Sequence, residues 1–336
     1  MTRVALDLLG GDSAPDCVVD GALLVADSSP DVEVLLVGPV DVAETLLRDR
    51  GASGRFALVQ ATEVVGMDED PARAIRSKRD ATVRVAARLV RDGAADAVVS
   101  VGSTGAALAA ALFTLGRLPG VSRPALAAVI PAPGGHLVLL DAGANPDGSV
   151  ELLTQFALAG HAFAQVRLGI ASPRVGLLSI GAEPGKGDAL RKEAFAALSA
   201  LPVDFVGCVE GGDVPHGGRA DVVVTDGFTG NVLLKGLEGA AAMLTDAVVD
   251  ALTATPERAA ASKDLLPVLV EATAGMQPDV LGGAVLLGVN GVCVVGHGGS
   301  SPQAVAACVG VAGQAVREGL VPRVAAALLE LKEASA

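Results

Sequence analysis

The chain alternates short apolar, β-branched runs with longer segments rich in alanine, leucine and charged residues. This alternation is typical of right-handed βαβ units, in which helices cover both faces of a largely parallel sheet. Several runs are almost continuously apolar, as strands buried on both faces are. The predicted strands span 3–9, 33–38, 56–61, 96–102, 126–131, 137–143, 175–181, 205–210, 221–227 and 292–298.

The segments between these strands carry the helical pattern. The predicted helices lie near 15–28, 40–50, 80–93, 103–116, 150–168, 187–200, 229–254, 257–273, 302–318 and 321–334. We therefore expect a three-layer α/β/α fold with a mostly parallel sheet. No internal repeat or long linker interrupts the alternation, so residues 1–336 are predicted to form one domain or two intertwined α/β subdomains.

Composition argues against several classes of function. The 336 residues carry a formal net charge of −13. A general nucleic-acid-binding protein needs a basic face, and purely electrostatic attachment to an anionic membrane needs basic residues too. The four dispersed cysteines form no CxxC pair, which predicts buried free thiols in a reducing cytoplasm. The N-terminus does not resemble a signal peptide, because Asp7 interrupts its apolar run.

The carboxyl ends of the predicted strands are rich in glycine, hydroxyl and amide residues. Ligands bind beyond these ends in α/β folds, and helix N-termini there present free N–H groups to anions. One such turn is weak evidence, but six along one edge of a sheet predict a cleft for phosphate or another small oxyanion. The candidate binding residues are Gly10, Gly11, Asp12, Gly102, Ser103, Thr104, Gly105, Asp141, Asn145, Gly227, Thr229, Gly230, His297, Gly298 and Ser300.

Two residues in these turns are candidates for chemistry. Lys186 lies between two glycines after a predicted strand, and Asn231 opens a predicted helix. Their ordinary alternatives are a solvated loop lysine and a helix cap. No spacing suggests a Ser-His-Asp group, a metal site or a nucleotide loop. The pattern favours chemistry in which a bound anion attacks while the protein supplies position and charge.

Eight stretches resemble, in family order and over nearly the whole chain, the phosphate acyltransferase family (PlsX-type acyl-acyl carrier protein:phosphate acyltransferases). They are "ALDLLGGDSAPD" (5–16), "VVGMDEDPARAIRSKRDATVRVA" (64–86), "DAVVSVGSTGAALAAALFTLGRLPGVSRPALAAVIP" (96–131), "LLDAGANPD" (139–147), "QFALAG" (155–160), "RVGLLSIGAEPGKGD" (174–188), "ADVVVTDGFTGNVLLKGLEG" (220–239) and "GGAVLLGVNGVCVVGHGGS" (282–300).

The resemblance implies that inorganic phosphate attacks the thioester of a long-chain acyl-acyl carrier protein, giving acyl phosphate and free carrier protein for phospholipid and phosphatidic acid synthesis. It implies Lys186 and Asn231 as the catalytic pair, with no metal and no cofactor. It also implies a cytoplasmic homodimer with an isocitrate/isopropylmalate dehydrogenase-like fold and a helical extension near 240–281. A glycerol-3-phosphate acyltransferase, which would consume the acyl phosphate, is an implied partner.

The chain departs from the family pattern at several positions. Ser13 replaces the usual histidine, and Ser103 and Ser179 replace the usual asparagines. Family members often carry a basic, apolar helical tip that touches the membrane, whereas the segment 251–281 is here more acidic than basic. Its apolar residues predict either peripheral contact with the inner face of the cell membrane or a dimer interface. These residues are Leu265, Leu266, Val268 and Leu269.

An acidic enzyme acting on an acidic carrier protein must offset their repulsion locally. The richest basic segment is 73–91, where Arg84, Arg88 and Arg91 share one helical face. One hypothesis is that this segment docks the carrier protein, and the alternative is a solvated helix face. The docking candidates are Arg79, Arg84, Arg88 and Arg91.

Three other functions stay open. A hydroxy-acid dehydrogenase of the same fold would need clustered metal-binding aspartates and substrate-gripping arginines, which cannot be located in the sequence. A phosphotransacetylase-like enzyme would use coenzyme A thioesters in place of carrier-protein thioesters. A non-catalytic scaffold would instead recruit acyltransferases to the membrane.

Overall fold

The computed structural model describes residues 1–133, 135–265, 267–269 and 281–334. The eleven strands of these residues form one sheet, in the order β3-β2-β1-β4-β11-β10-β5-β6-β9-β7-β8. The strands are β1 (Thr2–Asp7), β2 (Val32–Gly38), β3 (Ala57–Gln60), β4 (Ala97–Ser100), β5 (Ala125–Ala132), β6 (Gly135–Leu140), β7 (Arg174–Ser179), β8 (Asp204–Glu210), β9 (Val222–Val224), β10 (Ala284–Leu287) and β11 (Val292–Val295). The predicted α/β fold with a mostly parallel sheet is confirmed.

The sheet reverses direction at its centre. β3, β2, β1, β4 and β11 run parallel to one another, and so do β6, β9, β7 and β8. Between these halves, β10 is antiparallel to β11 and β5, and β5 is antiparallel to β6. The two parallel halves therefore run in opposite directions. The sequence analysis missed β10 because its four residues lie between glycines and show too short a pattern.

Eleven helices are bounded within the described residues, ten of them at or near predicted positions. They are α1 (Asp16–Ser28), α2 (Val40–Asp49), α3 (Pro71–Ser77), α4 (Thr82–Arg91), α5 (Thr104–Thr114), α6 (Val150–Arg167), α7 (Ala189–Ser199), α8 (Gly227–Thr253), α9 (Pro256–Ser262), α12 (Pro302–Arg317) and α13 (Leu320–Ala334). The prediction missed α3, which is too short to show a helical period. Its start is nevertheless well marked, because Asp70 caps it and Pro71 occupies its first turn.

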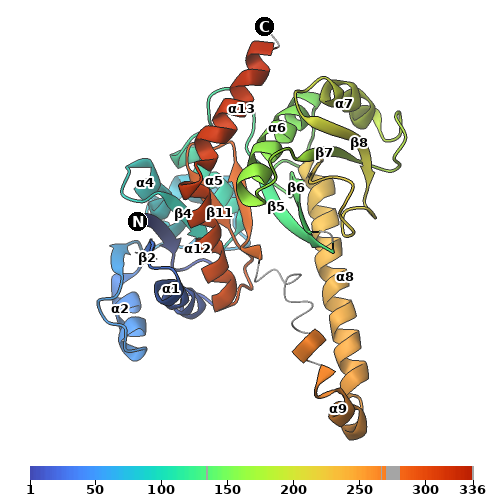
Figure 1. Cartoon of the computed structure of the whole chain (residues 1–336). Coiled ribbons are helices and arrows are strands. Elements are labelled where there is room, and N and C mark those ends of the chain that lie inside the picture. Colours follow the sequence, from blue (N-terminus) through green and yellow to red (C-terminus); the bar gives the residue numbers. More distant parts are fainter. Residues whose placement is uncertain (134, 266, 270–280, 335–336) are drawn as a thin grey trace.

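Helices cover both faces of the sheet, as the three-layer prediction requires (Figure 1). On one face α1 and α12 pack against the first half of the sheet, α6 packs against the second, and α13 packs mainly against α6. Phe156 and Phe163 of α6 are fully buried there. On the other face α4 and α5 form a second apolar cluster, in which α4 packs against β1 and β4 and the alanines of α5 allow close packing against α4 and β11.

One helix leaves the body of the molecule. α8 has 27 residues, of which only Gly227 and Gly230 are buried, and it carries α9 at its far end (Figure 1). Its described part agrees with the predicted helical extension, whereas residues 266 and 270–280 lie outside the described residues. Leu266 and part of the predicted helix 257–273 therefore have no structural account.

A helix that spans a membrane must be both long and apolar. No single helix among the described residues meets both requirements. The bent pair formed by α12 and the segment Leu320–Leu329 meets them only when its two members are taken together.

Candidate active site

The glycine-rich turns fall into two groups rather than one. The first loop group follows β1, β4 and β11 and comprises 10–13, 102–105 and 297–301. The second loop group follows β6, β7 and β9 and comprises 141–145, 180–188 and 225–231. Because the two halves of the sheet run in opposite directions, the expectation that all six turns share one edge is wrong. The antiparallel strands β10, β5 and β6 cause the reversal.

Sheet twist is nevertheless expected to turn the two groups toward each other. Adjacent strands rotate by about 20–25°, and β1 is seven steps from β7 in the strand order. Accumulated over those steps, the rotation is about 140–175°. That rotation largely cancels the reversal, so the carboxyl ends of the two half-sheets are expected to face a common side. Consistent with this, Ala142 and Ala144 join the same apolar cluster as Ala106 and Ala107 of α5.

Asp141 organises the second loop group. Its fully buried carboxylate accepts hydrogen bonds from four backbone N–H groups, those of Leu126, Gly143, Ala144 and Asn145, at 2.7–3.1 Å. Burial raises its pKa, and the donated hydrogen bonds oppose that rise. With so many donors around it, Asp141 holds the loop after β6 in shape and does not face a phosphate.

Asn145 is also engaged inside the protein. Its Nδ2 donates to the Pro124 carbonyl and to Asp141, each at 2.8 Å, and its side chain is buried. Its carbonyl accepts from Gly227 N at 2.7 Å. The predicted binding residue therefore joins the loop after β6 to the start of α8.

The start of α8 packs directly on that loop. A Cβ atom at Gly230 would lie 1.9 Å from the Asp141 carbonyl oxygen, and one at Gly227 would lie 2.6 Å from the Asn145 carbonyl oxygen. Asn231 follows at once and lies against Gly143, whose ideal Cβ position is 3.4 Å from Asn231 Oδ1. These two glycines act by permitting backbone contact, and through it they position Asn231.

An ion pair that the sequence analysis missed supports the same helix. Asp226 caps α8 by accepting from Thr229 N at 2.8 Å, and it also pairs with Arg191 of α7. Arg191 is buried, and it donates to Thr225 Oγ1 at 3.0 Å. Burial raises the pKa of Asp226, but the hydrogen bonds from Thr229 and Arg191 lower it by a larger amount. The net pKa is therefore below its ordinary value. The sequence did contain a signal for this ion pair. Arg191 lies in the first turn of a predicted helix, where the helix dipole disfavours a cation unless an acid lies nearby.

Replacing Asp226 by asparagine is expected to make stability less dependent on pH. A lowered pKa stabilises the fold above the unfolded pKa of about 3.9 and loses that effect as pH falls through the folded pKa. The variant should be less stable at pH 7 by about 1.5–3 kcal/mol, because a hydrogen bond to a charged group is weakened. Urea unfolding at pH 7 and at stepwise lower pH should show this gap narrowing. A gap that stays constant with pH would contradict the assignment.

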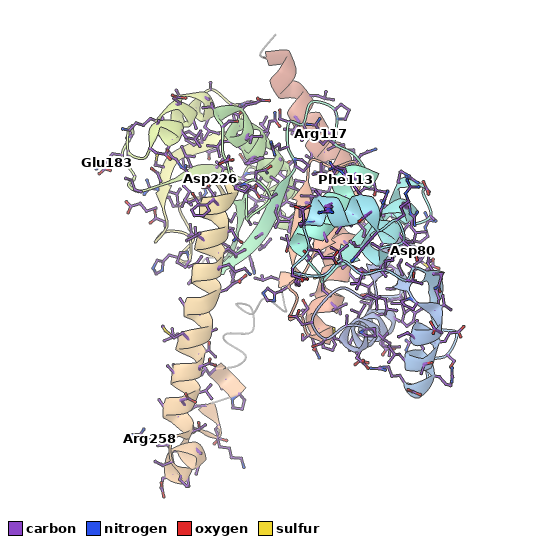
Figure 2. The ribbon with its side chains drawn as sticks, turned by 180° about the vertical axis from the view of Figure 1, so that it is seen from behind. Asp80, Phe113, Arg117, Glu183, Asp226 and Arg258 are labelled. Atoms are coloured by element: carbon purple, nitrogen blue, oxygen red, sulfur yellow. The ribbon has the colours of Figure 1, made fainter. Side chains whose placement is uncertain are left out.

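Lys186 and Asn231 come from neighbouring strands. Lys186 lies after β7 and Asn231 after β9, and Leu177 of β7 is in register with Val224 of β9. Both side chains are exposed, and Lys186 makes no ion pair with any residue that the structure describes. Figure 2 shows Asp226 where α8 joins the body, and Glu183, from the lysine's loop, on the same half. Among the described residues, an ammonium without an ion pair and an exposed amide are thus available on one half of the molecule.

The first loop group is built around Asp7 and Ser100, which the sequence analysis did not single out. Ser100 Oγ donates to Asp7 Oδ2 at 2.7 Å and accepts from Gly102 N at 3.2 Å. Gly10 fits beside them because a Cβ there would lie 2.8 Å from Asp7 Oδ2. Burial raises the pKa of Asp7, and hydrogen bonds from Thr82 and Ser100 oppose the rise. The missed signal was that Asp7 and Ser100 are polar residues at the ends of apolar strands, where a buried polar group needs a hydrogen-bond partner.

The remaining residues of the first loop group mostly order its turns. Ser103 caps α5 by accepting from Ala106 N at 3.4 Å. His297 Nδ1 accepts from Gly299 N at 3.1 Å, and Ser300 Oγ donates to the His297 carbonyl at 2.6 Å. Asp12 N donates to the Gly298 carbonyl at 2.8 Å, and Gly11 lies beside the same carbonyl. Thr104 is exposed at the start of α5, and Gly105 lies against Pro71.

The four predicted docking arginines differ in their contacts. Arg84 donates to the Ile75 carbonyl at 2.6 Å, and Arg91 pairs with Asp92 at 2.8 Å. Arg79 is exposed and Arg88 is half-buried, and neither makes an ion pair with a residue in the described ranges. The single helical face proposed from the sequence is therefore partly occupied by internal contacts. Within the part of the chain that the structure describes, no group of histidine, cysteine and acidic residues could hold a metal ion.

Comparison with protein families and individual relatives gives a consistent result. A family model described as "Fatty acid synthesis protein" matches residues 2–323. The phosphate acyltransferase of Desulfitobacterium hafniense is 44% identical over 322 residues, covering 96% of each chain. The phosphate acyltransferase of Myxococcus xanthus is 46% identical over 318 residues, covering 92% of this chain and 89% of that one.

Solved structures with the same fold include enzymes named as phosphotransacylases. The EutD phosphotransacetylase from Staphylococcus aureus matches with a TM-score of 0.62 at 16% identity, covering 94% of each chain. A branched-chain phosphotransacylase from Enterococcus faecalis matches with a TM-score of 0.56 at 16% identity, covering 94% of this chain and 99% of that one. At these identities the likeness concerns the fold alone.

Proposed function

Because this chain belongs to the phosphate acyltransferase family, we propose that it transfers a long-chain acyl group from an acyl carrier protein to inorganic phosphate. The product, an acyl phosphate, would enter phospholipid synthesis. The observation that supports this most directly is the pair Lys186 and Asn231, a free cation and a free amide at the ends of adjacent strands. Both groups can bind an oxyanion, and no protein nucleophile is needed.

The reaction follows from this chemistry. An oxygen of hydrogen phosphate attacks the thioester carbonyl carbon, and a tetrahedral oxyanion forms. Lys186 neutralises the phosphate and the developing oxyanion, while the Asn231 amide donates a hydrogen bond to the same group. The carbon–sulfur bond then breaks, and the proton carried by the phosphate passes to the departing sulfur. One thioester and one phosphate thus give one acyl phosphate and one thiol.

The direct test is phosphate-dependent loss of a palmitoyl thioester, with acyl phosphate observed by ³¹P NMR. Palmitoyl-carrier protein and palmitoyl-coenzyme A should be compared at equal concentrations. We expect turnover of the carrier-protein form to be faster. Preferred use of coenzyme A would favour the phosphotransacetylase-like alternative. Absence of turnover with both thioesters would favour the non-catalytic scaffold.

We also propose that α8 forms a homodimer interface. Met243 and Leu244 are 68% and 63% exposed on a helix that stands away from the body (Figure 1). Apolar side chains on a helix without a packing partner stabilise the helix only when a second surface covers them. The other roles implied by the resemblance also remain proposals: a single functional unit over 1–336, an isopropylmalate dehydrogenase-like arrangement, a cytoplasmic location with membrane contact through Leu265 and Val268, and a glycerol-3-phosphate acyltransferase partner.

Replacing Met243 and Leu244 together by aspartate is expected to convert a dimer into a monomer, because two buried charges would oppose association. Sedimentation velocity at micromolar concentration should report twice the 33.2 kDa chain mass for the wild type and one chain mass for the variant. Leu329→Asp is the control, since Leu329 is an exposed leucine on α13. A monomeric wild type or a dimeric double variant would contradict the proposed interface.

A further inference from the structure

A pocket in the first loop group is not used by the proposed chemistry at Lys186 and Asn231. It has a volume of about 160 Å³ and lies at the carboxyl ends of β1 and β4. Sites for whole small molecules measure about 300–1,000 Å³, so this pocket fits a slender group or one part of a longer ligand. The side chains that matter for its chemistry are Asp7, Leu9, Val65, Met67, Val83 and Ala106.

The lining of this pocket does not suit a phosphate ion. None of its residues is basic, and two of them, Asp7 and Asp12, are acids. Burial raises the pKa of Asp7, so this part of the pocket disfavours negative charge. Asp7 and Thr82 are buried polar residues in the lining among apolar walls, and the second lone pairs of their oxygens are the acceptors available to a ligand. The pocket therefore fits an uncharged chain that donates hydrogen bonds from amide or hydroxyl groups.

The rim of the pocket connects it to α3. Val64 and Met67 line the pocket and are 46% and 62% exposed, so its mouth is apolar and open to solvent. Lys78 at the end of α3 donates to the Val64 carbonyl at 2.8 Å and pairs with Glu69. The rim and α3 are thus held together as one surface.

That surface presents three exposed arginines, Arg73, Arg76 and Arg79, which we call the arginine surface. The guanidinium of Arg76 lies 4.6 Å from the ring centre of Phe113, which is itself 48% exposed. None of the three makes an ion pair with a residue that the structure describes. Most acids near these arginines are engaged elsewhere: Glu69 pairs with Lys78, Asp80 accepts from Thr62, and Asp70 caps α3. Of the acids in this segment, Asp68 is the remaining one.

Free cations in a chain of net charge −13 mark a place for an acidic partner. We propose that the arginine surface docks an acidic carrier protein and that the pocket beside it binds the carrier's pantetheine arm. The arm is a neutral chain with two amides and a hydroxyl, which match the pocket's acceptors and apolar walls. This inference rests on the proposed function. It assigns part of the pantetheine arm to the first loop group, while the thioester at the end of the arm reaches the phosphate held by the second loop group. It moves the docking surface from α4, where the sequence placed most of it, to α3.

The test compares one acyl group on three carriers: the carrier protein, free pantetheine and N-acetylcysteamine, which has only the end of the arm. Ala106→Leu places a larger side chain in the pocket and reduces its volume. It should raise KM about tenfold for the carrier-protein and pantetheine thioesters and leave N-acetylcysteamine unchanged. The double variant Arg73→Glu, Arg79→Glu should raise KM about tenfold for the carrier-protein thioester alone.

Two further variants keep the test decisive. Arg48→Glu with Arg323→Glu makes the same change of charge on exposed residues of α2 and α13 and should change no KM. Met67→Glu alters the exposed rim and should reproduce the pocket effect even if Ala106→Leu does not fold. The proposal is wrong if the pocket variants raise KM for phosphate, or if the arginine variants affect all three thioesters equally. A wild type inactive on every thioester would instead overturn the proposed function itself.

Discussion

Replacing Lys186 by alanine is expected to lower kcat for phosphate-dependent loss of the acyl thioester by about 10²–10³. That is the usual effect of removing one group that stabilises a developing oxyanion. The KM for phosphate should rise as well, because the lysine is the free cation of the second loop group. Stability should not change, since the side chain is exposed and makes no ion pair with a described residue. Steady-state rates with acyl-carrier protein at varied phosphate concentration give both constants.

Lys192→Ala is the matched control for that experiment. Lys192 is an exposed lysine six positions further along, on α7, and its loss removes the same charge from the same region. It should leave kcat within a factor of two of the wild type. If Lys186→Ala keeps full turnover, or if the two variants lose activity equally, Lys186 is not the catalytic cation.

Gly230→Ala is expected to be the most destabilising small substitution in the site. The added Cβ would lie 1.9 Å from the carbonyl oxygen of Asp141. Because this oxygen belongs to the backbone, no side-chain rotation can relieve the contact. We expect a loss of about 3 kcal/mol or more in the free energy of unfolding, at the upper end of overpacking effects. For a chain of this size that corresponds to a fall in Tm of roughly 4 °C. Calorimetry measures both.

Gly236→Ala makes the same chemical change in the same helix, six residues further on. Nothing lies within 4 Å of the ideal Cβ position there. Because alanine favours helix more than glycine, the control should be unchanged or up to about 1 kcal/mol more stable. Equal destabilisation of both variants would show that loss of glycine itself, and not contact with Asp141, matters.

The fold was largely predictable because its signal is repeated along the chain. Ten of the eleven described strands follow from apolar runs, since each run is long enough to show its pattern. β10 and α3 were missed because four and seven residues carry too little periodicity. The direction of the second half of the sheet was missed for a different reason. A strand's polarity depends on which neighbour it pairs with, and the pairing of β5 with β10 joins residues far apart in sequence.

The site was less predictable than the fold. A polar residue at a strand end either binds a ligand or orders its own loop, and only its partners distinguish these roles. Asn145 donates to Pro124, twenty-one positions away, a contact that no local pattern reports. Arg191 and Asp226 likewise meet across thirty-five positions. By contrast, Lys186 is exposed and makes no ion pair within the described ranges, which fits both a ligand-binding lysine and the solvated loop lysine that the sequence left open.

The central reversal of the sheet has a mechanical consequence. The two loop groups belong to oppositely directed half-sheets that are joined through the narrow antiparallel strip of β10 and β5. We therefore expect the separation of the two loop groups to depend on the accumulated twist of that strip. A small change of twist distributed over a few strands would produce a larger displacement at the two loop groups, because they lie far from the strip. Substitutions buried in the middle of the sheet could then tune substrate entry without altering a single binding group.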